Sequence, residues 1–479
     1  MTEETKKFYI TTPIYYVNDK PHIGHAYTTV AADVLARLHR QVGNETFFLV
    51  GTDEHGVKIA QAAEAAGKSP QEFVDEIAAK FSFAWDTLEI SNDRFIRTTE
   101  PAHISAVEKA LQFMYDKGDI YLGKYEGLYC RGCEQFKMEK DLVDGKCPDH
   151  KIVPEKMSEE TYMFRLSKYQ AELLEKIESD DLQISPVSRK NEIVNFYKKD
   201  GLQDISFSRK NVKWGIPLPW DKSHTTYVWA DAFLNYLTGL DWQGPKDPPP
   251  ALWPADIQLM SKDILRVHTT IWPAMLLSLG LAVPAKIFVH GFFTVGGEKM
   301  SKSLGNVIDP NDWAAKYGSD AVRYFLLREV PFGQDGDVSE EKLKARFNGD
   351  LANGLGNLFS RTTNMIEKYL DGQLEDAVRS PKDLSAASEA FYNLDFAGGL
   401  VAIWQEIAWA NQLIDKSKPW ELFKTDPAKV KELLLNLAAL LHDIALKLSP
   451  VMPETADKIR QLLESGDVKK AEPLFLKKD

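Results

Sequence analysis

The sequence predicts an α/β fold in which a doubly wound parallel sheet is interrupted by an insertion and followed by an all-α helix bundle. Three observations lead to this prediction. Residues 8–39 have the pattern of a buried strand, a loop and a helix. Short apolar segments at 46–50, 257–260 and 287–289 have the pattern of further buried strands. From about residue 346 onward the strand signal vanishes and helical periodicity replaces it.

Length and composition are those of a globular protein. The chain has 479 residues, of which 44% are apolar and 27% charged, and this length favours roughly three domains. The polar segment 1–7 lacks the apolar core of a secretory signal, and the longest apolar stretch, 271–285, is shorter than a membrane span and contains two prolines. We therefore expect a cytoplasmic protein without membrane association. The net charge of −12 argues against a protein that covers nucleic acid nonspecifically, so contacts to nucleic acid would need local basic patches.

The first segment, residues 1–115, opens with the strand–loop–helix unit. His22, Gly24 and His25 lie where the helix of 26–39 is expected to begin. The first N–H groups of a helix lack intrahelical partners and lie at the positive end of its dipole, so they stabilise phosphate, and the imidazoles can add donors. This pattern predicts a cradle for ATP that lacks the G-x-G-x-x-G spacing. Taken alone, the same residues also suit two surface histidines near a helix start.

The second predicted strand, 46–50, runs into Asp53. Ligands of doubly wound folds gather at the carboxyl ends of the strands, so Asp53 is placed to meet a cation. The alternative is an aspartate that only caps a loop. Helical patterns at 70–88 and 101–117 then cover the sheet.

Residues 116–225 form the predicted insertion. The three cysteines, Cys130, Cys133 and Cys147, are an odd number that does not suit a disulfide framework. With His150 they spell C-x2-C-x13-C-x2-H, the ligand spacing of a tetrahedral zinc site. Four protein ligands leave no position for water, which favours one structural zinc ion per chain. The alternative is three buried thiols beside an unrelated histidine.

The second half of the doubly wound domain is expected at 226–345. A strand at 257–260 ends at Ser261-Lys262-Asp263, and a helix follows at 264–281. After the strand of 287–289 comes a glycine-flanked loop that carries two lysines three residues apart, Lys299 and Lys302, on either side of Ser301.

Residues 346–479 are expected to form the helix bundle, with helical stripes at 385–415 and 433–448. Asn353, Asn357 and Arg361 recur at i, i+4 and i+8 and so share one helix face. Their side chains can hydrogen-bond unstacked bases, and Pro419-Trp420 offers an aromatic platform for stacking. The alternative is a solvated polar face and a core tryptophan.

His22-Ile23-Gly24-His25 and Lys299-Met300-Ser301-Lys302-Ser303, in this order on strand–loop–helix units, resemble the two signature motifs of the class I aminoacyl-tRNA synthetases. Over essentially the whole chain the residues are similar to methionyl-tRNA synthetases. The resemblance implies ATP-dependent activation of L-methionine with Mg²⁺, and transfer to the terminal adenosine of initiator and elongator methionine tRNA. It makes 1–115 and 226–345 the halves of a Rossmann-like catalytic domain, the latter with a stem-contact region, and 346–479 the anticodon-binding domain. The insertion is too short for the large editing inserts of related enzymes.

The resemblance also implies roles for individual residues. His22, His25, Lys299 and Lys302 would be catalytic, and together with Gly24, Asp263 and Ser301 they would bind ATP. The anticodon would be read by Asn353, Asn357, Arg361, Pro419 and Trp420. The methionine site would comprise Pro13, Ile14, Tyr16, Asp53, Trp229, Ala232, Tyr236, His268 and Trp272, although each aromatic residue also suits a plain core role.

Two positions depart from the family pattern: Ser261, where the family usually has glycine, and Val267, where it usually has an aromatic residue. We expect a monomer, because the chain ends without the dimerisation and tRNA-binding module that some members append. Two other functions compete. One is a class I synthetase of another, cysteine-like specificity. The other is a non-catalytic tRNA-binding paralogue, against which the presence of both histidines and both lysines argues.

Overall fold

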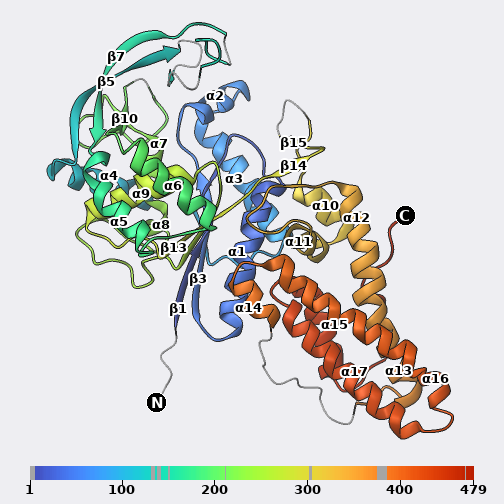
Figure 1. The fold of residues 1–479 in the computed structure, drawn as a ribbon. Coiled ribbons are helices and arrows are strands. Elements are labelled where there is room, and N and C mark those ends of the chain that lie inside the picture. The colour runs from blue at the N-terminus through green and yellow to red at the C-terminus, as the bar shows by residue number, and fades with distance from the viewer. Residues whose placement is uncertain are drawn as a thin grey trace, which may run out of the picture.

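The structure, a computed structural model, describes residues 6–130, 135–137, 142–148, 151–210, 212–300, 305–374, 386–469 and 471–479. An α/β body occupies the middle of the molecule, a long β-ribbon formed by β5 and β7 extends from it at one end, and a helix bundle extends from it at the other (Figure 1). Within the described part of the chain, no helix is long and apolar enough to cross a membrane.

The α/β body is built on a seven-stranded sheet in which every neighbouring pair is parallel, with the order β2-β3-β1-β12-β13-β8 and β4 beside β3. This confirms the predicted doubly wound fold. Successive connections run from β1 to β3 in one direction and from β12 to β13 in the other, so the order reverses between β1 and β12. The strands are β1 (Lys7–Thr11), β2 (Tyr15–Tyr16), β3 (Glu45–Asp53), β4 (Arg94–Arg97), β8 (Gln183–Ser185), β12 (Ile257–Ser261) and β13 (Lys286–His290).

Helices cover the sheet close to where the sequence places them. The first, α1, begins three residues earlier than its apolar periodicity suggests, because His22 supplies its N-terminal cap. The start of α3 is fixed by the capping box of Ser69 and Glu72. Polar side chains, and not the apolar pattern, thus fix the N-termini of α1 and α3. The helices of this body are α1 (Ile23–Gln41), α2 (Val57–Ala65), α3 (Pro70–Thr87), α4 (Pro101–Asp116), α7 (Val228–Ala232), α8 (Asn235–Thr238), α9 (Leu265–Leu279), α10 (Pro310–Tyr317) and α11 (Ser319–Arg328).

The range 116–225 contains more than an inserted sheet. Its antiparallel sheet has the order β6-β5-β7-β9, and between β7 and β9 the chain forms β8, which pairs with β13 in the main sheet. Because β8 has only three residues and is followed directly by Pro186, it gives no recognisable strand pattern in the sequence. Its elements are β5 (Ile120–Cys130), β6 (Gln135–Lys137), β7 (Glu155–Phe164), η2 (Leu166–Tyr169), α5 (Gln170–Glu178), α6 (Val187–Lys199), β9 (Ile205–Ser206), β10 (Ser208–Arg209) and β11 (Thr225–Thr226).

From residue 293 onward the described elements are helices apart from one small sheet of β14, β15 and β16, and the helices after residue 346 confirm the predicted bundle. The stripe at 385–415 is two helices, because Leu394 adopts a positive φ of 64° and Asp395 caps the second one. These elements are β14 (Phe293–Val295), β15 (Glu298–Lys299), β16 (Gly336–Asp337), α12 (Glu340–Arg346), the π-helix η4 (Phe347–Gly356), α13 (Asn357–Leu370), α14 (Ala386–Tyr392), α15 (Phe396–Ser417), α16 (Pro419–Leu422), α17 (Pro427–Leu448) and α18 (Pro453–Glu464).

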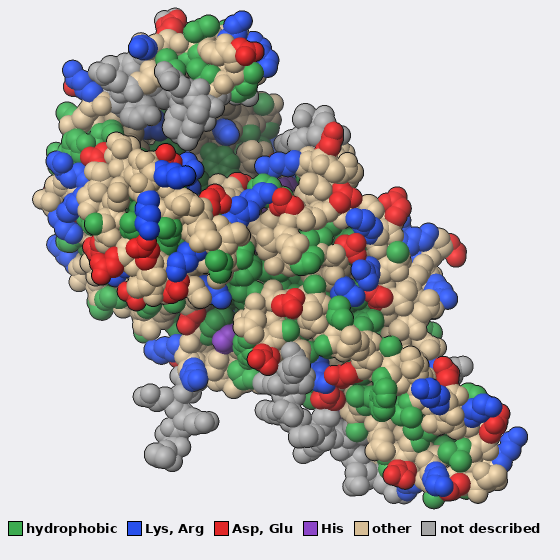
Figure 2. Space-filling view, in the orientation of Figure 1, with side chains coloured by type: hydrophobic (Ala, Val, Ile, Leu, Met, Phe, Trp, Pro, Cys, Tyr) green, Lys and Arg blue, Asp and Glu red, His purple; other side chains and the backbone are tan. Residues whose placement is uncertain are grey.

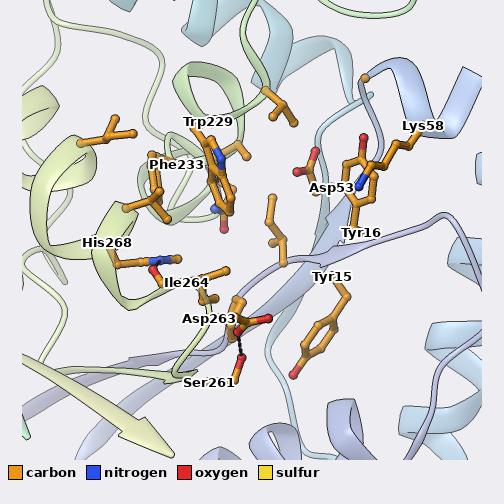
Figure 3. Close-up of a pocket in the computed structure, with 18 of the residues that line it drawn as sticks. Tyr15, Tyr16, Asp53, Lys58, Trp229, Phe233, Ser261, Asp263, Ile264 and His268 are labelled. Atoms are coloured by element: carbon orange, nitrogen blue, oxygen red, sulfur yellow. Dashed lines mark hydrogen bonds between the residues drawn. The ribbon is translucent and has the colours of Figure 1, made fainter. Parts of the chain in front are cut away.

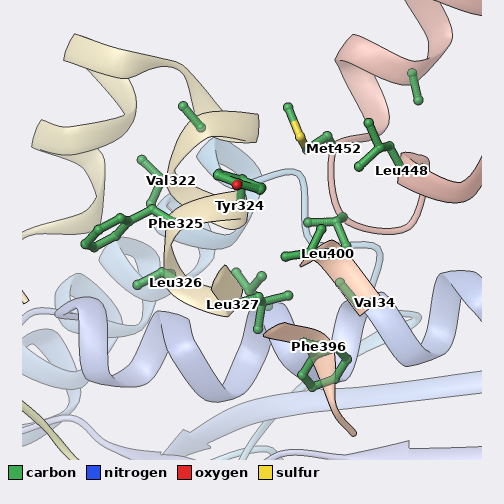
Figure 4. Packing of buried hydrophobic residues seen from close by; sticks show 14 of the residues in the cluster. Val34, Val322, Tyr324, Phe325, Leu326, Leu327, Phe396, Leu400, Leu448 and Met452 are labelled. Carbon is green, nitrogen blue, oxygen red and sulfur yellow. The ribbon is translucent and has the colours of Figure 1, made fainter. Parts of the chain in front are cut away.

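One hydrophobic core runs from the sheet into the bundle. Val34 of α1, Phe325 of α11, Leu400 of α15 and Leu448 of α17 belong to the same cluster of buried side chains. Figure 4 shows the α11 side chains lying between α1 and the helices of the bundle. The bundle is therefore docked on the α/β body through apolar packing.

Candidate active site

A cavity of about 1120 Å³ opens at the carboxyl ends of β1 and β12, where the strand order reverses. It is larger than the roughly 300–1,000 Å³ of most small-molecule sites. Figure 3 shows aromatic and carboxylate side chains around it, contributed by both halves of the sheet. Its lining includes thirteen residues that the sequence assigns to substrate sites: Pro13, Ile14, Tyr16, His22, Gly24, His25, Asp53, Trp229, Ala232, Tyr236, Asp263, His268 and Lys299.

His22 and His25 form a reciprocal cap at the start of α1. The Gly24 N–H donates to His22 Nδ1 at 3.0 Å, and the His22 N–H donates to His25 Nδ1 at 3.2 Å. Burial lowers the pKa of His22 to about 4 and that of His25 well below its usual value. Both rings are therefore neutral, and because each Nδ1 accepts a hydrogen bond, each proton lies on Nε2.

The cap changes the expected role of the helix terminus. The Ile23 N–H donates to the Ile308 carbonyl at 3.0 Å, the Gly24 N–H to His22 Nδ1, and the His25 N–H to the His22 carbonyl at 2.9 Å. These first N–H groups already have partners, so the expectation that they would bind phosphate directly does not fit this arrangement. The donors left for an anion are the two Nε2–H groups.

Gly24 also serves the cap. A Cβ atom at this position would lie 2.8 Å from Cε1 of the His22 ring and 3.4 Å from Cε of Met300. Any larger residue would displace the imidazole that closes the helix terminus. The glycine therefore makes room for His22 itself as well as for a ligand.

Asp53 ends β3 and is buried, and its Oδ1 has no hydrogen-bond partner in the described part of the chain. Burial and the nearby charge of Asp231 raise its pKa well above the usual value, while a hydrogen bond from the His55 N–H acts in the opposite direction. A ligand cation would compensate this carboxylate. Asp53 thus suits an ammonium group.

Aromatic side chains form the inner wall of the cavity. Trp229 and Phe233 stack with ring centroids 5.2 Å apart, and the Tyr236 hydroxyl lies 2.9 Å from Nε2 of His268. Nδ1 of His268 donates to the Ile264 carbonyl at 2.9 Å, so Nε2 accepts from Tyr236. Burial lowers the pKa of His268 to about 4, which keeps it neutral. The wall therefore presents no net charge to a side chain.

Trp272 differs from its prediction as part of the methionine site. It is fully buried and does not line the cavity, its Nε1–H donates to Gln258 Oε1 at 3.2 Å, and its ring stacks on Phe233. Phe233 takes the lining position, which sequence reasoning missed although it directly follows Ala232 on the same helical turn. Val267, the departure from the family pattern, does line the cavity.

At the carboxyl end of the sheet, Asp263 follows β12 and accepts a hydrogen bond from the Ser261 hydroxyl (Figure 3). The serine that replaces the usual glycine thus orients the carboxylate. The exposed Lys299 reaches the cavity from β15, with its Nζ 4.6 Å from the Phe292 ring centroid. Ser301 and Lys302 lie outside the described residues.

Two of the four predicted metal ligands, Cys130 and Cys147, are described, and both are buried. Cys147 follows a tight reversal in which Val143 and Lys146 exchange backbone hydrogen bonds, a turn of the kind that presents metal ligands. Cys133 and His150 lie outside the described residues. No group of three or more metal-binding side chains occurs among the residues that are described.

A second, smaller cavity of about 350 Å³ lies in the bundle and brings Asn353, Asn357 and Arg361 together. Asn353 is on the π-helix η4, whereas Asn357 and Arg361 are on α13. The three residues therefore do not share one regular α-helix, because the turn that carries Asn353 is a wider π-helical turn. Asn357 donates to Asn411 at 2.9 Å and Arg361 pairs with Asp415 at 2.5 Å. Pro419, which is buried, and Trp420, which is 44% exposed, lie outside this lining.

A family model described as tRNA synthetases class I (M) matches residues 8–153 and 150–363. The chain is 48% identical over 472 residues to the methionine–tRNA ligase of Caldanaerobacter subterraneus subsp. tengcongensis, covering 96% of this chain and 74% of the relative. It is 45% identical over 494 residues to that of Bacillus subtilis, covering 98% and 74%.

A solved structure of Mycobacterium tuberculosis methionyl-tRNA synthetase in complex with methionyl-adenylate superposes with a TM-score of 0.87 at 39% identity, covering 99% of each chain. The apo form of that enzyme superposes with a TM-score of 0.81 at 35% identity. Both matches extend over the α/β body, the insertion and the bundle.

Proposed function

Because the chain belongs to the class I methionyl-tRNA synthetase family, we propose that the large cavity at the ends of β1 and β12 activates L-methionine with ATP. The activity is that of a methionine–tRNA ligase. The methionine carboxylate attacks the α-phosphate of ATP, pyrophosphate leaves, and the aminoacyl group of methionyl-adenylate then passes to the terminal ribose of tRNA. The protein needs no nucleophile for this reaction, so positioning and charge stabilisation dominate.

The histidine cap supports the placement of the phosphates. Neutral His22 and His25 have their protons on Nε2, and these two donors are the free ones at the start of α1. As negative charge grows on the phosphates, the charges of Lys299 and Lys302 would stabilise it, together with the Mg²⁺ that arrives with ATP. Ser301 and Gly24 would contact the nucleotide, and Asp263, oriented by Ser261, would bind the ribose.

The opposite end of the cavity suits methionine. The unpaired Oδ1 of Asp53 would accept the α-ammonium, and this is the single observation that carries the proposal most strongly. Trp229, Phe233 and Tyr236 offer polarisable rings to a thioether, each contact worth roughly 0.3–1.5 kcal/mol. Pro13, Ile14, Tyr16, Ala232 and His268 would complete the methionine site, with Trp272 supporting Phe233 from behind.

The bundle is proposed to read the tRNA anticodon. Asn353, Asn357 and Arg361 converge on one cavity, where their amide and guanidinium groups can hydrogen-bond base edges. Trp420, which is partly exposed beside Pro419, offers a stacking surface. In this scheme 1–115 and 226–345 form the catalytic domain, 116–225 the connective insertion and 346–479 the anticodon-binding domain, and the enzyme acts as a monomer in the cytoplasm.

We further propose that one zinc ion stabilises the insertion. Two buried cysteines, one at the end of β5 and one after a tight turn, fit a closed thiolate site, and Cys133 and His150 would complete it. Such an ion would hold the segment of Cys130 and Cys133 to that of Cys147 and His150, and would take no part in the chemistry of the main cavity.

The test is exchange of labelled pyrophosphate into ATP, measured with each amino acid. Exchange should depend on methionine, and cysteine should give none. A cysteine-dependent exchange would instead establish the competing specificity, and absence of exchange with every amino acid would contradict the assignment of the cavity.

A further inference from the structure

Asp231, a carboxylate that is only 1% exposed, lies between two histidines beside the amino-acid end of the cavity. Its Oδ2 is 2.7 Å from Nδ1 of His55, and its Oδ1 is 2.8 Å from Nε2 of His103. The other nitrogen of His103, Nδ1, is 2.7 Å from the Thr238 hydroxyl. A carboxylate only accepts, so both histidines donate to Asp231. The result is a continuous buried chain, which we call the Asp231 chain: His55, Asp231, His103 and Thr238.

The Asp231 chain joins α4 to three parts of the chain that line the cavity, the end of β3 and helices α7 and α8, although none of its own side chains lines the cavity. His55 follows β3 two residues after Asp53, and its N–H donates to the Asp53 carboxylate. Asp231 is on α7, the helix that also carries Trp229. Thr238 is on α8 with Tyr236, and His103 reaches both helices from α4. The chain therefore acts on the substrate only through the residues it holds.

Asp231 also influences Asp53 electrically. After burial, the charge of Asp231 is the largest cause that raises the pKa of Asp53. Glu54 acts in the same direction but is paired with Arg97 at 2.7 and 2.9 Å. Among the described residues, Tyr16 of β2 interacts electrostatically with Asp53, and Lys58 of α2 lines the same cavity (Figure 3). Arg209, Lys210 and Tyr227 also line it, whereas His55 and His103 face Asp231.

We propose that Asp231 is a positioning residue for the amino acid: held by His55 and His103, it locks the Asp53 loop against the helix of Trp229, and its charge sets the lowest pH at which Asp53 binds the α-ammonium. This rests on the proposed function of the cavity. A buried anion disfavours the ionisation of a carboxyl group beside it. The charge of Asp231 therefore raises the lowest pH at which Asp53 is ionised and can bind an ammonium group. The two histidines stabilise Asp231 as an anion and so maintain that effect.

The test is Asp231→Asn in the full-length enzyme, with kcat/KM for methionine measured by pyrophosphate exchange across pH. Removing the like charge lowers the pKa of Asp53, so the acid limb should move to lower pH. At neutral pH, kcat/KM should fall several-fold because the chain is broken. An acid limb that stays in place or moves upward overturns the proposal.

Asp119→Asn is the matched control. Asp119 is equally buried and accepts hydrogen bonds from Lys168, Tyr169 and Ser278, but its charge is not among those that shift the pKa of Asp53. The pH profile of kcat/KM for Asp119→Asn should keep the acid limb of the wild-type enzyme. An acid limb that moves as far as in Asp231→Asn would also overturn the proposal, because removing any buried carboxylate would then have the same effect. Wild-type enzyme without methionine-dependent exchange would contradict the proposed function instead, which separates the two failures.

Thr238→Val covers the case in which Asp231→Asn does not fold. This change is nearly isosteric and removes only the hydroxyl at the end of the chain. The KM for methionine should rise roughly fivefold with kcat within about twofold, as expected when one buried hydrogen bond that orients a binding wall is lost. An unchanged KM would overturn the positioning role. Thr363→Val, which removes a buried hydroxyl on α13 in the bundle, should leave KM unchanged.

Discussion

Arg323 and Asp33 form an ion pair of 2.6 Å between side chains that are both fully buried. Arg323, on α11, also donates to the carbonyls of Leu88, Pro450 and Val451 at 2.8–3.0 Å. Asp33 lies on α1, and Pro450 and Val451 form the turn between α17 and α18. One guanidinium thus connects the helix that begins with the histidine motif to the bundle.

We predict that Arg323→Met destabilises the protein by about 3–5 kcal/mol, because it leaves the buried Asp33 carboxylate without its main counter-charge. Urea unfolding measures the change. Lys458→Met is the control: its pair with Glu454 on α18 is exposed, so the change should stay within about 0.5 kcal/mol. A decrease in the free energy of unfolding below about 1 kcal/mol for Arg323→Met would show that the Arg323–Asp33 ion pair contributes little to stability.

Two substitutions at His22 separate its structural and chemical roles. Asparagine caps helices well, so His22→Asn should keep the thermal stability of α1 but lose the Nε2–H donor. We expect a 10²- to 10³-fold slower single-turnover formation of adenylate, roughly the effect of losing one donor to a developing charge. His22→Ala should show the same rate loss and an added destabilisation of about 1 kcal/mol. A wild-type rate for His22→Asn would exclude the imidazole from catalysis.

Lys302→Ala should slow adenylate formation about 10²- to 10³-fold with little change in methionine affinity, because its charge is needed chiefly as the phosphates gain negative charge. Single-turnover kinetics provide the rate, and equilibrium binding provides the affinity. Lys80→Ala, on the exposed face of α3 in a pair with Glu76, is the control and should match wild type. A rate for Lys302→Ala within threefold of wild type would refute the assigned role.

We predict one tightly held zinc ion per chain. Replacing Cys147 by serine should lower the metal content and destabilise the 116–225 region more than it changes ATP binding, since a closed site of four protein ligands is structural. Metal analysis of protein purified without chelator gives the stoichiometry, and limited proteolysis locates the destabilised region. Less than half an equivalent of zinc in the wild-type protein would contradict the prediction.

Selectivity should follow the shape of the cavity, since its aromatic wall carries no group that singles out sulfur. Norleucine replaces the sulfur by a methylene, a difference worth about 1–3 kcal/mol, and should be activated at a reduced but measurable rate. Isoleucine is branched next to its α-carbon and should clash with Trp229 and Tyr236. Exchange kinetics with each amino acid measure the ratio. A higher kcat/KM for isoleucine than for norleucine would refute the methionine pocket.

The sequence predicts those parts of the site that depend on local pattern. His22 and His25 follow the loop after the buried strand β1, Asp53 ends β3 and Asp263 follows β12, so the topology alone brings them to one edge of the sheet. Strand β8 was missed because its three residues gain their order from pairing with β13, a tertiary contact.

Contacts between distant elements explain the other differences. Trp272 on α9 and Phe233 at the end of α7 are both apolar aromatic residues, and only the packing decides which one faces the cavity. Hydrogen-bonded partners in the Asp231 chain lie up to 176 residues apart in the sequence, so no spacing rule reveals it. The hydrogen bond from the Ile23 N–H at the start of α1 to the Ile308 carbonyl likewise joins distant parts of the sequence, so the local sequence pattern does not predict it.

The arrangement of β1 beside β12 has a consequence for synthesis of the chain. The Tyr9 N–H bonds to the Asp256 side chain 247 residues later, and β1 pairs with β12. At about 5–20 residues per second, a ribosome would need roughly 12–50 seconds to make that intervening chain. Throughout this time the edge of β1 that faces β12 is an unpaired apolar strand edge, the kind of surface that promotes aggregation. The nascent N-terminal half is thus exposed to aggregation during this time. The cap at the start of α1 cannot be completed until Ile308, whose carbonyl accepts from the Ile23 N–H, has left the exit tunnel.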